Sequence, residues 1–265
     1  AYGRPVEGTE ASVRRLDRQR VQEFFKRYYR PNRTIMSVVG DVSEQEISAA
    51  LNQALKNWSK GVPSKAPTAP VQSDVAKILR VNKDLTQANI ILGHSGVPRG
   101  HPDYYAIQVM NYILGGGGFS SRAMDSIRNE RGLAYSVYSH FAAEKSHGSF
   151  QFVMQTKNES AQEAIRLARE EIRRMREELV SEVELSDAKD YLIGSFPLRF
   201  DTNRKIAGFL GQVEYYELGL DYPDRYGELI RKVSRADVQR VARTHLSPEN
   251  FITVVVGNQQ KITVQ

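Results

Sequence analysis

One stretch of the chain occurs twice: LDRQRVQEFFKRYYRPNRTIMSVVGD at residues 16–41 returns, without a gap, as VSRADVQRVARTHLSPENFITVVVGN at residues 233–258. Each copy has the pattern of an amphipathic helix, a turn with proline, and a short apolar strand that ends in glycine. A repeat this long indicates two copies of one domain rather than a solenoid of small units. The identical positions are Arg18/Arg235, Val21/Val238, Gln22/Gln239, Pro31/Pro248, Ile35/Ile252, Val38/Val255, Val39/Val256 and Gly40/Gly257.

The two copies have very different lengths of chain in front of them. If the second domain starts near residue 75, 158 residues precede the second copy, whereas 15 precede the first, a difference of 143. We therefore expect residues 1–58 to be the tail of a first domain that lacks its front. Residues 59–74 contain three prolines and no periodicity, which predicts a stiff linker. Residues 75–265 are expected to form a whole second domain.

The order of the predicted elements points to a fold class. In the first part we expect helices at 17–29 and 43–57, the second opened by a capping box of Ser43 and Glu46, with a strand at 34–40 between them. Strands in hairpins followed by a block of helices predict an α+β fold, in which helices pack on a layered antiparallel sheet. In the second part we expect strands near 75–82, 87–97, 134–143, 149–156 and 251–257, helices near 102–114 and 120–130, and mostly helices from 159 to about 245.

Composition describes an ordinary globular protein and excludes several classes. Of 265 residues, 40% are hydrophobic and 26% charged, and no apolar run approaches the roughly 20 residues needed to span a bilayer. The absence of cysteine excludes disulfides and thiolate metal sites and leaves the compartment unassigned. The net charge of +6 suggests nucleic acid, but on the amphipathic stretch 161–179 charges alternate in sign, as in Glu170/Arg174 and Arg173/Glu177. We therefore expect no nucleic-acid partner.

None of the five histidines belongs to a zinc-peptidase motif. Neither His-x-x-Glu-His nor its reverse spacing occurs. His140, Glu144 and His147 would share one face of a helix, but alternation over residues 135–141 and Gly148 indicate a hairpin around 145–148. We therefore predict that the chain holds no metal.

The run Gly115, Gly116, Gly117, Gly118 interrupts the predicted helices. It lacks the Lys-Ser/Thr of a phosphate-binding loop, and the glycine spacing of a dinucleotide site is absent. Consecutive glycines permit unusual backbone dihedrals. The run is interpreted as a hinge between two helices that could also touch the backbone of a ligand.

The segment from Met124 to Tyr135 could present two polar side chains to one point. Arg128 borders the apolar face of the expected helix, Gly132 suits the left-handed residue after a helix, and Tyr135 opens the next strand. From these residues alone a structural role is favoured over a catalytic one, because tyrosine is common in strands.

The motifs taken together resemble the pitrilysin (inverzincin) peptidases, which include insulysin and the mitochondrial processing peptidase. The resemblance rests first on GGGGFSSR at 115–122 and IRNERGLAY at 127–135. The ordered set spans nearly the whole chain and is closest to the bacterial and mitochondrial-type members. Its other motifs are YGRP at 2–5 with Gly8-Thr9, Tyr29-x-Pro31-Asn32, Val39-Gly40-Asp41, and Leu185 to Ser195.

The resemblance implies duplicated α+β domains whose halves close around a chamber. In this family one half binds zinc through His-x-x-Glu-His and a downstream Glu, and the other supplies an Arg and a Tyr seven residues apart. Arg128 and Tyr135 have that spacing and are the expected catalytic residues, with the glycine run 115–118 as a substrate contact. No cofactor is expected in this chain, and zinc is expected in the complete enzyme or a partner half. The expected substrate is a peptide or unfolded protein.

Several alternatives stay open at this point. The parent is either a zinc-bearing chain whose metal site lies before residue 1, or a zinc-lacking partner subunit. A catalytically inactive scaffold of the same fold is the main rival to an enzymatic role, and a basic nucleic-acid-binding module is a third reading. The compartment stays unknown, with the bacterial cytoplasm or periplasm expected for a soluble chain of this kind.

Overall fold

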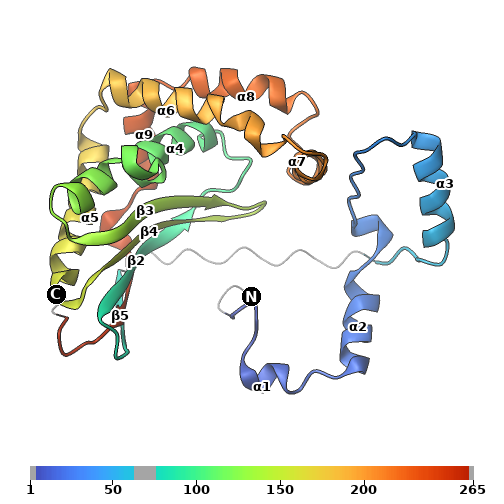
Figure 1. Ribbon diagram of the computed structural model, residues 1–265, viewed down its shortest axis with the longest axis horizontal. Helices are drawn as coiled ribbons and strands as arrows, with labels where there is room; N and C mark the ends of the chain where they lie inside the picture. The colour runs from blue at the N-terminus through green and yellow to red at the C-terminus, as the bar shows by residue number, and fades with distance from the viewer. Residues whose placement is uncertain (1–3, 63–75, 263–265) are drawn as a thin grey trace. The chain divides into compact units, whose positions relative to one another are not determined.

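The computed structural model describes residues 4–62 and 76–262 of the chain (Figure 1). These residues fall into two compact units. The first contains the described part of Ala1–Pro70 together with Pro197–Leu220, and the second contains the described part of Val71–Phe196 together with Asp221–Gln265. Most of the predicted linker, residues 63–74, lies outside the described residues.

The second unit is built on a five-stranded sheet in the order β1-β5-β2-β4-β3. β1 and β5 are parallel, and the other neighbouring pairs are antiparallel. Buried and more exposed side chains alternate along the strands, so one face of the sheet is buried and the other is more open. In β4 the buried face carries Phe150, Phe152 and Met154. The predicted α+β class is confirmed. The bounds are β1 Lys77–Asn82, β2 Gln87–Gly96, β3 Ala134–Ala143, β4 Gly148–Lys157 and β5 Ile252–Gly257.

Helices cover the buried face of this sheet in two layers (Figure 1). α4 and α5 pack against the strands, α9 packs against both of these helices, and α6 and α8 pack against α4. The predicted helix at 102–114 ends in a wider, π-helical turn at Tyr112–Gly116, and the predicted helix at 120–130 is π-helical over Met124–Asn129. The bounds are α4 Tyr104–Asn111, α5 Ala161–Glu177, α6 Glu182–Gly194, α8 Tyr222–Arg231 and α9 Arg235–His245.

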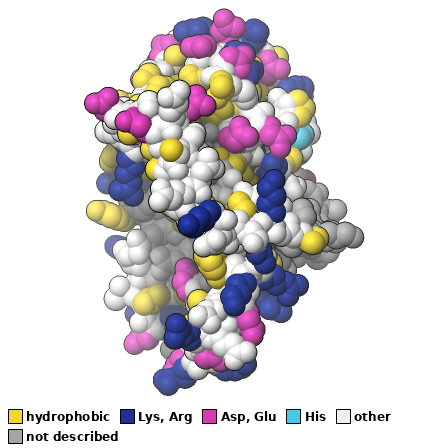
Figure 2. Space-filling model, turned by 90° about the vertical axis from the view of Figure 1, so that its right-hand side faces the viewer, with side chains coloured by type: hydrophobic (Ala, Val, Ile, Leu, Met, Phe, Trp, Pro, Cys, Tyr) yellow, Lys and Arg dark blue, Asp and Glu magenta, His cyan; other side chains and the backbone are white. Residues whose placement is uncertain are grey.

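Charged side chains of both signs are interspersed on the face of the molecule shown in Figure 2.

On α5 ion pairs at i,i+4 occur, as predicted, but their partners differ from those that the sequence suggested. Glu170 pairs with Arg166 at 2.8 Å, and Arg174 pairs with Glu178 at 3.4 Å. Within the described ranges, no helix combines the length and the apolar character needed to cross a bilayer.

The two copies of the sequence repeat each form a helix followed by a short 3-10 turn. In the first unit, α2 spans Arg18–Tyr28, and the ungapped alignment of the two copies places these ends on Arg235 and His245, the bounds of α9 in the second unit. The short turn Pro31–Arg33 likewise corresponds to Pro248–Asn250. Each helix begins at a side-chain cap, Asp17 in one copy and Ser234 in the other. Two segments of limited identity therefore begin and end their helices at the same places.

The prediction of a strand at 34–40 is wrong: the structure describes these residues, and they form no strand. Its counterpart β5 is hydrogen-bonded between β1 and β2, whereas residues 34–40 pair with no strand among the described residues. A strand needs a partner to satisfy its backbone groups, so an apolar pattern alone does not make one.

The apolar side chains of the first copy are exposed where those of the second are buried. Val21 and Phe24 are 56% and 57% exposed, whereas their counterparts Val238 and Val241 are fully buried. The first unit thus presents the face that α9 uses for packing in the second unit. The other helices of this unit are α1 Glu10–Val13, α3 Glu44–Leu55, which has the predicted capping box, and α7 Asn203–Tyr215.

Candidate functional site

Arg128 and Tyr135 are brought together by a helix end and the start of a strand. Arg128 lies in the last turn of the helical segment Met124–Asn129. The chain leaves this segment through Gly132, whose φ of +63° is left-handed and whose N–H donates to the carbonyl of Arg128 at 2.9 Å. The predicted left-handed glycine is therefore confirmed. Tyr135 follows as the second residue of β3.

Tyr135 occupies a β-bulge between β3 and β4. Ala134 is paired with Thr156 and Ser136 with Gln155, so Tyr135 is the extra residue on its strand. A bulge redirects the side chain of the extra residue. The residue is 75% exposed. The sheet thus holds the backbone of Tyr135 in place and leaves the phenol open to a ligand.

The guanidinium group of Arg128 lies close to two aromatic rings. Its Cζ atom is 5.6 Å from the ring centre of Tyr135 and 4.9 Å from that of Phe119, both within the range of a cation–π interaction. Its Nη1 contacts Sδ of Met124 at 3.7 Å. No carboxylate among the described residues forms an ion pair with Arg128, so its charge and its other hydrogen-bond donors are available to a ligand.

Phe119 belongs to this site and was missed by the sequence analysis. The signals in the sequence are a large apolar residue placed directly after four glycines and its place in the motif GGGGFSSR at 115–122. In a loop, hydrophobic periodicity does not show whether a side chain is buried or exposed, so such a residue could equally be assigned to the core.

The four glycines next to Phe119 have different surroundings. A Cβ on Gly115 would lie 2.5 Å from the backbone nitrogen of Ser139, on Gly116 it would meet the Asn111 side chain at 2.6 Å, and on Gly117 it would lie 2.8 Å from a carbonyl. These three glycines therefore let the turn pack tightly. Gly118 has a φ of +58° and open space around its Cβ position, so a ligand contact of the run would be made at Gly118.

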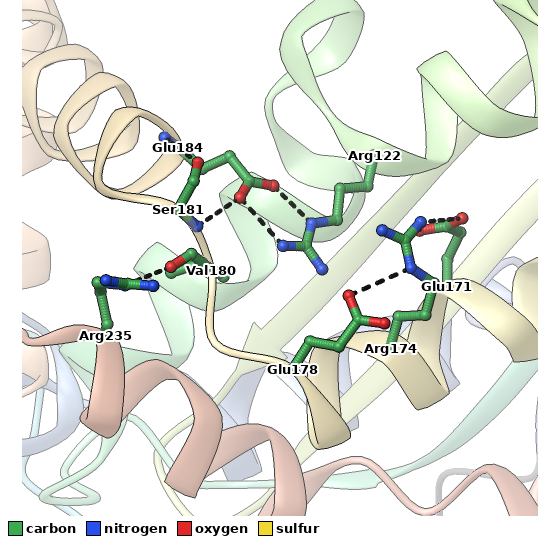
Figure 3. Close-up of polar contacts among 8 residues, drawn as sticks. All are labelled: Arg122, Glu171, Arg174, Glu178, Val180, Ser181, Glu184 and Arg235. Atoms are coloured by element: carbon green, nitrogen blue, oxygen red, sulfur yellow. Dashed lines mark hydrogen bonds and ion pairs between the residues drawn. The ribbon is translucent and has the colours of Figure 1, made fainter.

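Arg122 fixes the segment that carries Arg128 to helix α6 (Figure 3). Its Nε and Nη2 donate to the two carboxylate oxygens of Glu184, at 2.5 and 3.0 Å. Glu184 also accepts the N–H of Ser181, the N-cap of α6, at 2.7 Å. Burial opposes ionisation of Glu184, but the hydrogen bonds from Arg122 and Ser181 and the charge of Arg122 outweigh it and lower the pKa of this carboxyl to about 2.

His101, Asp103 and His245 are the one group of potential metal ligands within residues 4–62 and 76–262. Asp103 accepts a hydrogen bond from Nε2 of His245 at 2.8 Å and pairs with Arg240 at 2.9 Å. Nδ1 of His101 accepts the backbone N–H of Asp103 at 3.1 Å. Nδ1 of His101, Nε2 of His245 and both carboxylate oxygens of Asp103 thus already have partners, and the positive charge of Arg240 disfavours a metal cation beside Asp103. The group joins α4 to α9 and does not fit a catalytic zinc ion.

The other histidine cluster considered from the sequence lies in a hairpin, as predicted. β3 ends at Ala143 and β4 begins at Gly148, and the turn is closed by a hydrogen bond from the N–H of Glu144 to the carbonyl of His147 at 2.8 Å. His140 therefore does not share a helical face with these two residues.

Comparison with known proteins places this geometry in a family. A zinc protease of Streptomyces coelicolor, otherwise uncharacterized, is 27% identical over 261 residues, covering 96% of this chain and 57% of the relative. A protein of Helicobacter pylori named as a non-peptidase homolog is 27% identical over 255 residues, covering 96% of this chain and 59% of the relative. The chain thus spans less than two thirds of the length of these relatives.

A solved structure and a family description agree with each other. The crystal structure of a peptidase M16 inactive domain from Pseudomonas fluorescens superimposes with a TM-score of 0.89 at 27% identity, covering 98% of this chain and 61% of that one. The family described as the peptidase M16 inactive domain matches residues 15–192, more than half of the chain. The Arg128/Tyr135 segment lies inside this match, and the chain belongs to the peptidase M16 (pitrilysin) family and carries its inactive domain.

Proposed function

We propose that the chain is the carboxyl-side, zinc-lacking portion of a zinc metalloendopeptidase. In this proposal Arg128 and Tyr135 bind the substrate and the transition state opposite a zinc site located elsewhere. The observation that carries it is the open phenol on a bulge, 5.6 Å from a guanidinium group that has no acidic partner among the described residues. Relatives from Streptomyces coelicolor and Bacillus subtilis that are named zinc proteases support it.

The two side chains suit the charge that develops during peptide hydrolysis. When water adds to a peptide carbonyl, its oxygen gains negative charge, and a placed hydrogen-bond donor stabilises that charge. In our proposal the hydroxyl of Tyr135 donates to this oxygen. Arg128 binds a backbone carbonyl of the substrate through charge-assisted hydrogen bonds and holds the ring of Tyr135 by its cation–π contact. The substrate is a peptide or an unfolded segment of a protein.

Zinc belongs to the facing half in this proposal. A bound zinc ion polarises the substrate carbonyl and activates water. This chain has no His-x-x-Glu-His motif, and the His101, Asp103 and His245 group does not fit the ion. The facing half is part of the same polypeptide or a partner subunit.

We further propose that residues 1–58 belong to a first domain homologous to the second. α2 and α9 begin and end at equivalent positions of the two sequence copies, which supports the duplication. The exposed Val21 and Phe24 support it as well, because α9 buries the same positions against other helices of its unit. Helices with apolar side chains, packed as α4 and α5 pack on α9, would cover these two residues.

A scaffold without peptidase activity is the second candidate. A relative from Helicobacter pylori favours it, because that protein is similar to nearly the whole of this chain and is named a non-peptidase homolog. A pure scaffold would have no need for an exposed Tyr135 beside an Arg128 that lacks an acidic partner among the described residues.

Peptide cleavage by the full-length protein separates the two candidates. The protein is assayed with an unstructured, internally quenched peptide, first alone and then mixed with a zinc-bearing M16 subunit from the same organism. We expect cleavage in at least one case, lost with a chelator and restored by added zinc. Absence of cleavage in both cases, with zinc bound to the mixture, would favour the scaffold.

A further inference from the structure

Phe119 is a large apolar side chain that the fold holds out of its own core. The residue is 72% exposed, and its ring centre lies 4.9 Å from the guanidinium carbon of Arg128. A phenylalanine this exposed gains little stability from burial of its ring. Single exposed apolar residues are common on proteins, so the exposure matters here because of the neighbouring groups.

The turn that presents Phe119 is anchored on both sides. Before it, Gly117 packs so closely on Tyr112 that a Cβ would lie 2.9 Å from the tyrosine ring, and Gly118 takes the left-handed φ of +58°. After it, the buried Ser121 donates from its hydroxyl to the carbonyl of Gly118 at 2.7 Å and from its backbone N–H to the same oxygen at 3.1 Å. The exposure of Phe119 is therefore a property of a defined turn.

Phe119 and Tyr135 both lie within cation–π distance of Arg128. The guanidinium carbon of Arg128 is 4.9 Å from one ring centre and 5.6 Å from the other, and the two aromatic residues are 72% and 75% exposed. A peptide whose carbonyl is held by Arg128 would bring a neighbouring side chain near the ring of Phe119. Apolar contact there would bury the ring, whereas a basic side chain would be repelled by Arg128.

We propose that Phe119 determines specificity by contacting an apolar side chain, such as that of Leu, Met or Phe, next to the substrate carbonyl bound by Arg128. This inference rests on the proposed function. In this inference the ring of Phe119 selects among substrates, and the glycine run positions that ring. Tyr135 has the separate role of stabilising charge on every substrate.

Phe119→Ala tests the inference in the complete enzyme, in a series of peptides that differ at one residue beside the cleaved bond. We expect kcat/KM for peptides with Leu or Phe at that position to fall roughly 10-fold to 100-fold, as for the loss of apolar contacts in a binding pocket. The peptide with Gly there should change less than about 2-fold, since it lacks the side chain that Phe119 contacts. Phe119→Leu should restore most of the preference.

A matched control is Val183→Ala, which removes another exposed apolar side chain, 68% exposed on α6 of the same unit. It should change no peptide in the series. An equal fall of kcat for all peptides with Phe119→Ala would contradict a specificity role, because it would mean that the ring only positions Arg128. Unchanged kinetics for all peptides would also overturn the inference.

Binding to the chelator-inhibited enzyme separates this inference from the proposed function. Fluorescence anisotropy measures the Kd of a labelled Leu peptide and of its Gly analogue, with and without Phe119→Ala. If Phe119→Ala weakens binding of the Leu peptide but not of the Gly peptide, and Tyr135→Phe leaves turnover unchanged, the apolar contact is kept and the catalytic proposal is rejected. A fall in turnover of about 100-fold with Tyr135→Phe, together with no change in either Kd with Phe119→Ala, would keep the catalytic proposal and reject the apolar contact.

Discussion

Replacing Tyr135 with phenylalanine is expected to lower kcat of the complete enzyme about 100-fold, with zinc content unchanged. The phenol is 75% exposed and forms no hydrogen bond with any described residue, so its loss removes a donor to the substrate and little else. KM should change much less, because the donor acts when charge develops on the carbonyl oxygen. Steady-state kinetics with metal analysis of each preparation measures both quantities.

Tyr138→Phe is the control for this substitution. Tyr138 lies further along the same strand and is 45% exposed. Its ring makes no cation–π contact with Arg128 among the described residues, so kcat should stay within about 2-fold of the wild type. If Tyr135→Phe behaves like Tyr138→Phe, the hydroxyl of Tyr135 has no part in the chemistry.

Replacing Arg122 with methionine is expected to lower the free energy of unfolding by about 2–3 kcal/mol. The side chain of Arg122 is 12% exposed and that of Glu184 31%, so the substitution leaves a partly buried carboxylate without its two hydrogen bonds from the guanidinium. Chemical denaturation at pH 7 measures the loss. The loss is smaller than for a fully buried pair because solvent still reaches Glu184.

The same pair gives stability a dependence on acid. The pKa of Glu184 is about 2 in the folded protein, below its usual value of 4.5, so its stabilising contribution is complete above about pH 4.5 and is lost as pH falls toward 2. In Arg122→Met this part of the acid dependence should shrink. Arg166→Met is the control, because that arginine makes a similar paired contact with Glu163 on the exposed side of α5 and should change stability far less. Equal losses for the two variants would contradict the anchoring role of Arg122.

The sequence predicts those parts of the fold that depend on local pattern. The repeat marked the bounds of α2 and α9, the capping box of Ser43 and Glu46 opened α3, and Gly132 ended its helix in the left-handed region. Each of these depends on residues within about one helical turn of each other. The strands of the second unit were also found close to their predicted ends, because alternation and turn residues agree there.

Features that depend on a distant partner could not be predicted. The strand expected at 34–40 failed because an apolar pattern does not supply the neighbouring strand. At the π-helical turn Tyr112–Gly116, Gly115 packs closely on Ser139, which belongs to the later strand β3. A helix-period pattern cannot distinguish such a turn from an α-helix.

The candidate site shows the same division. The spacing of Arg128 and Tyr135 was visible in the sequence, and with Gly132 it suggested that they meet. The bulge that exposes Tyr135 depends on the register between β3 and β4, and β4 is a separate strand later in the chain. Phe119 lies beside Arg128 in a turn with a left-handed glycine that no helix or strand period describes, and the Arg122–Glu184 pair joins two distant parts of the sequence.

The most direct test of a joint role for Arg128 and Tyr135 is a double-mutant cycle in kcat/KM. Arg128→Met, Tyr135→Phe and the double variant are assayed in the complete enzyme on one peptide. Because Arg128 holds the ring of Tyr135 in our proposal, the two effects should overlap, and the double variant should be slowed by less than the product of the two single effects. A double variant slowed by the product of the two single effects would show that the residues act independently, and three variants as fast as the wild type would remove the pair from catalysis.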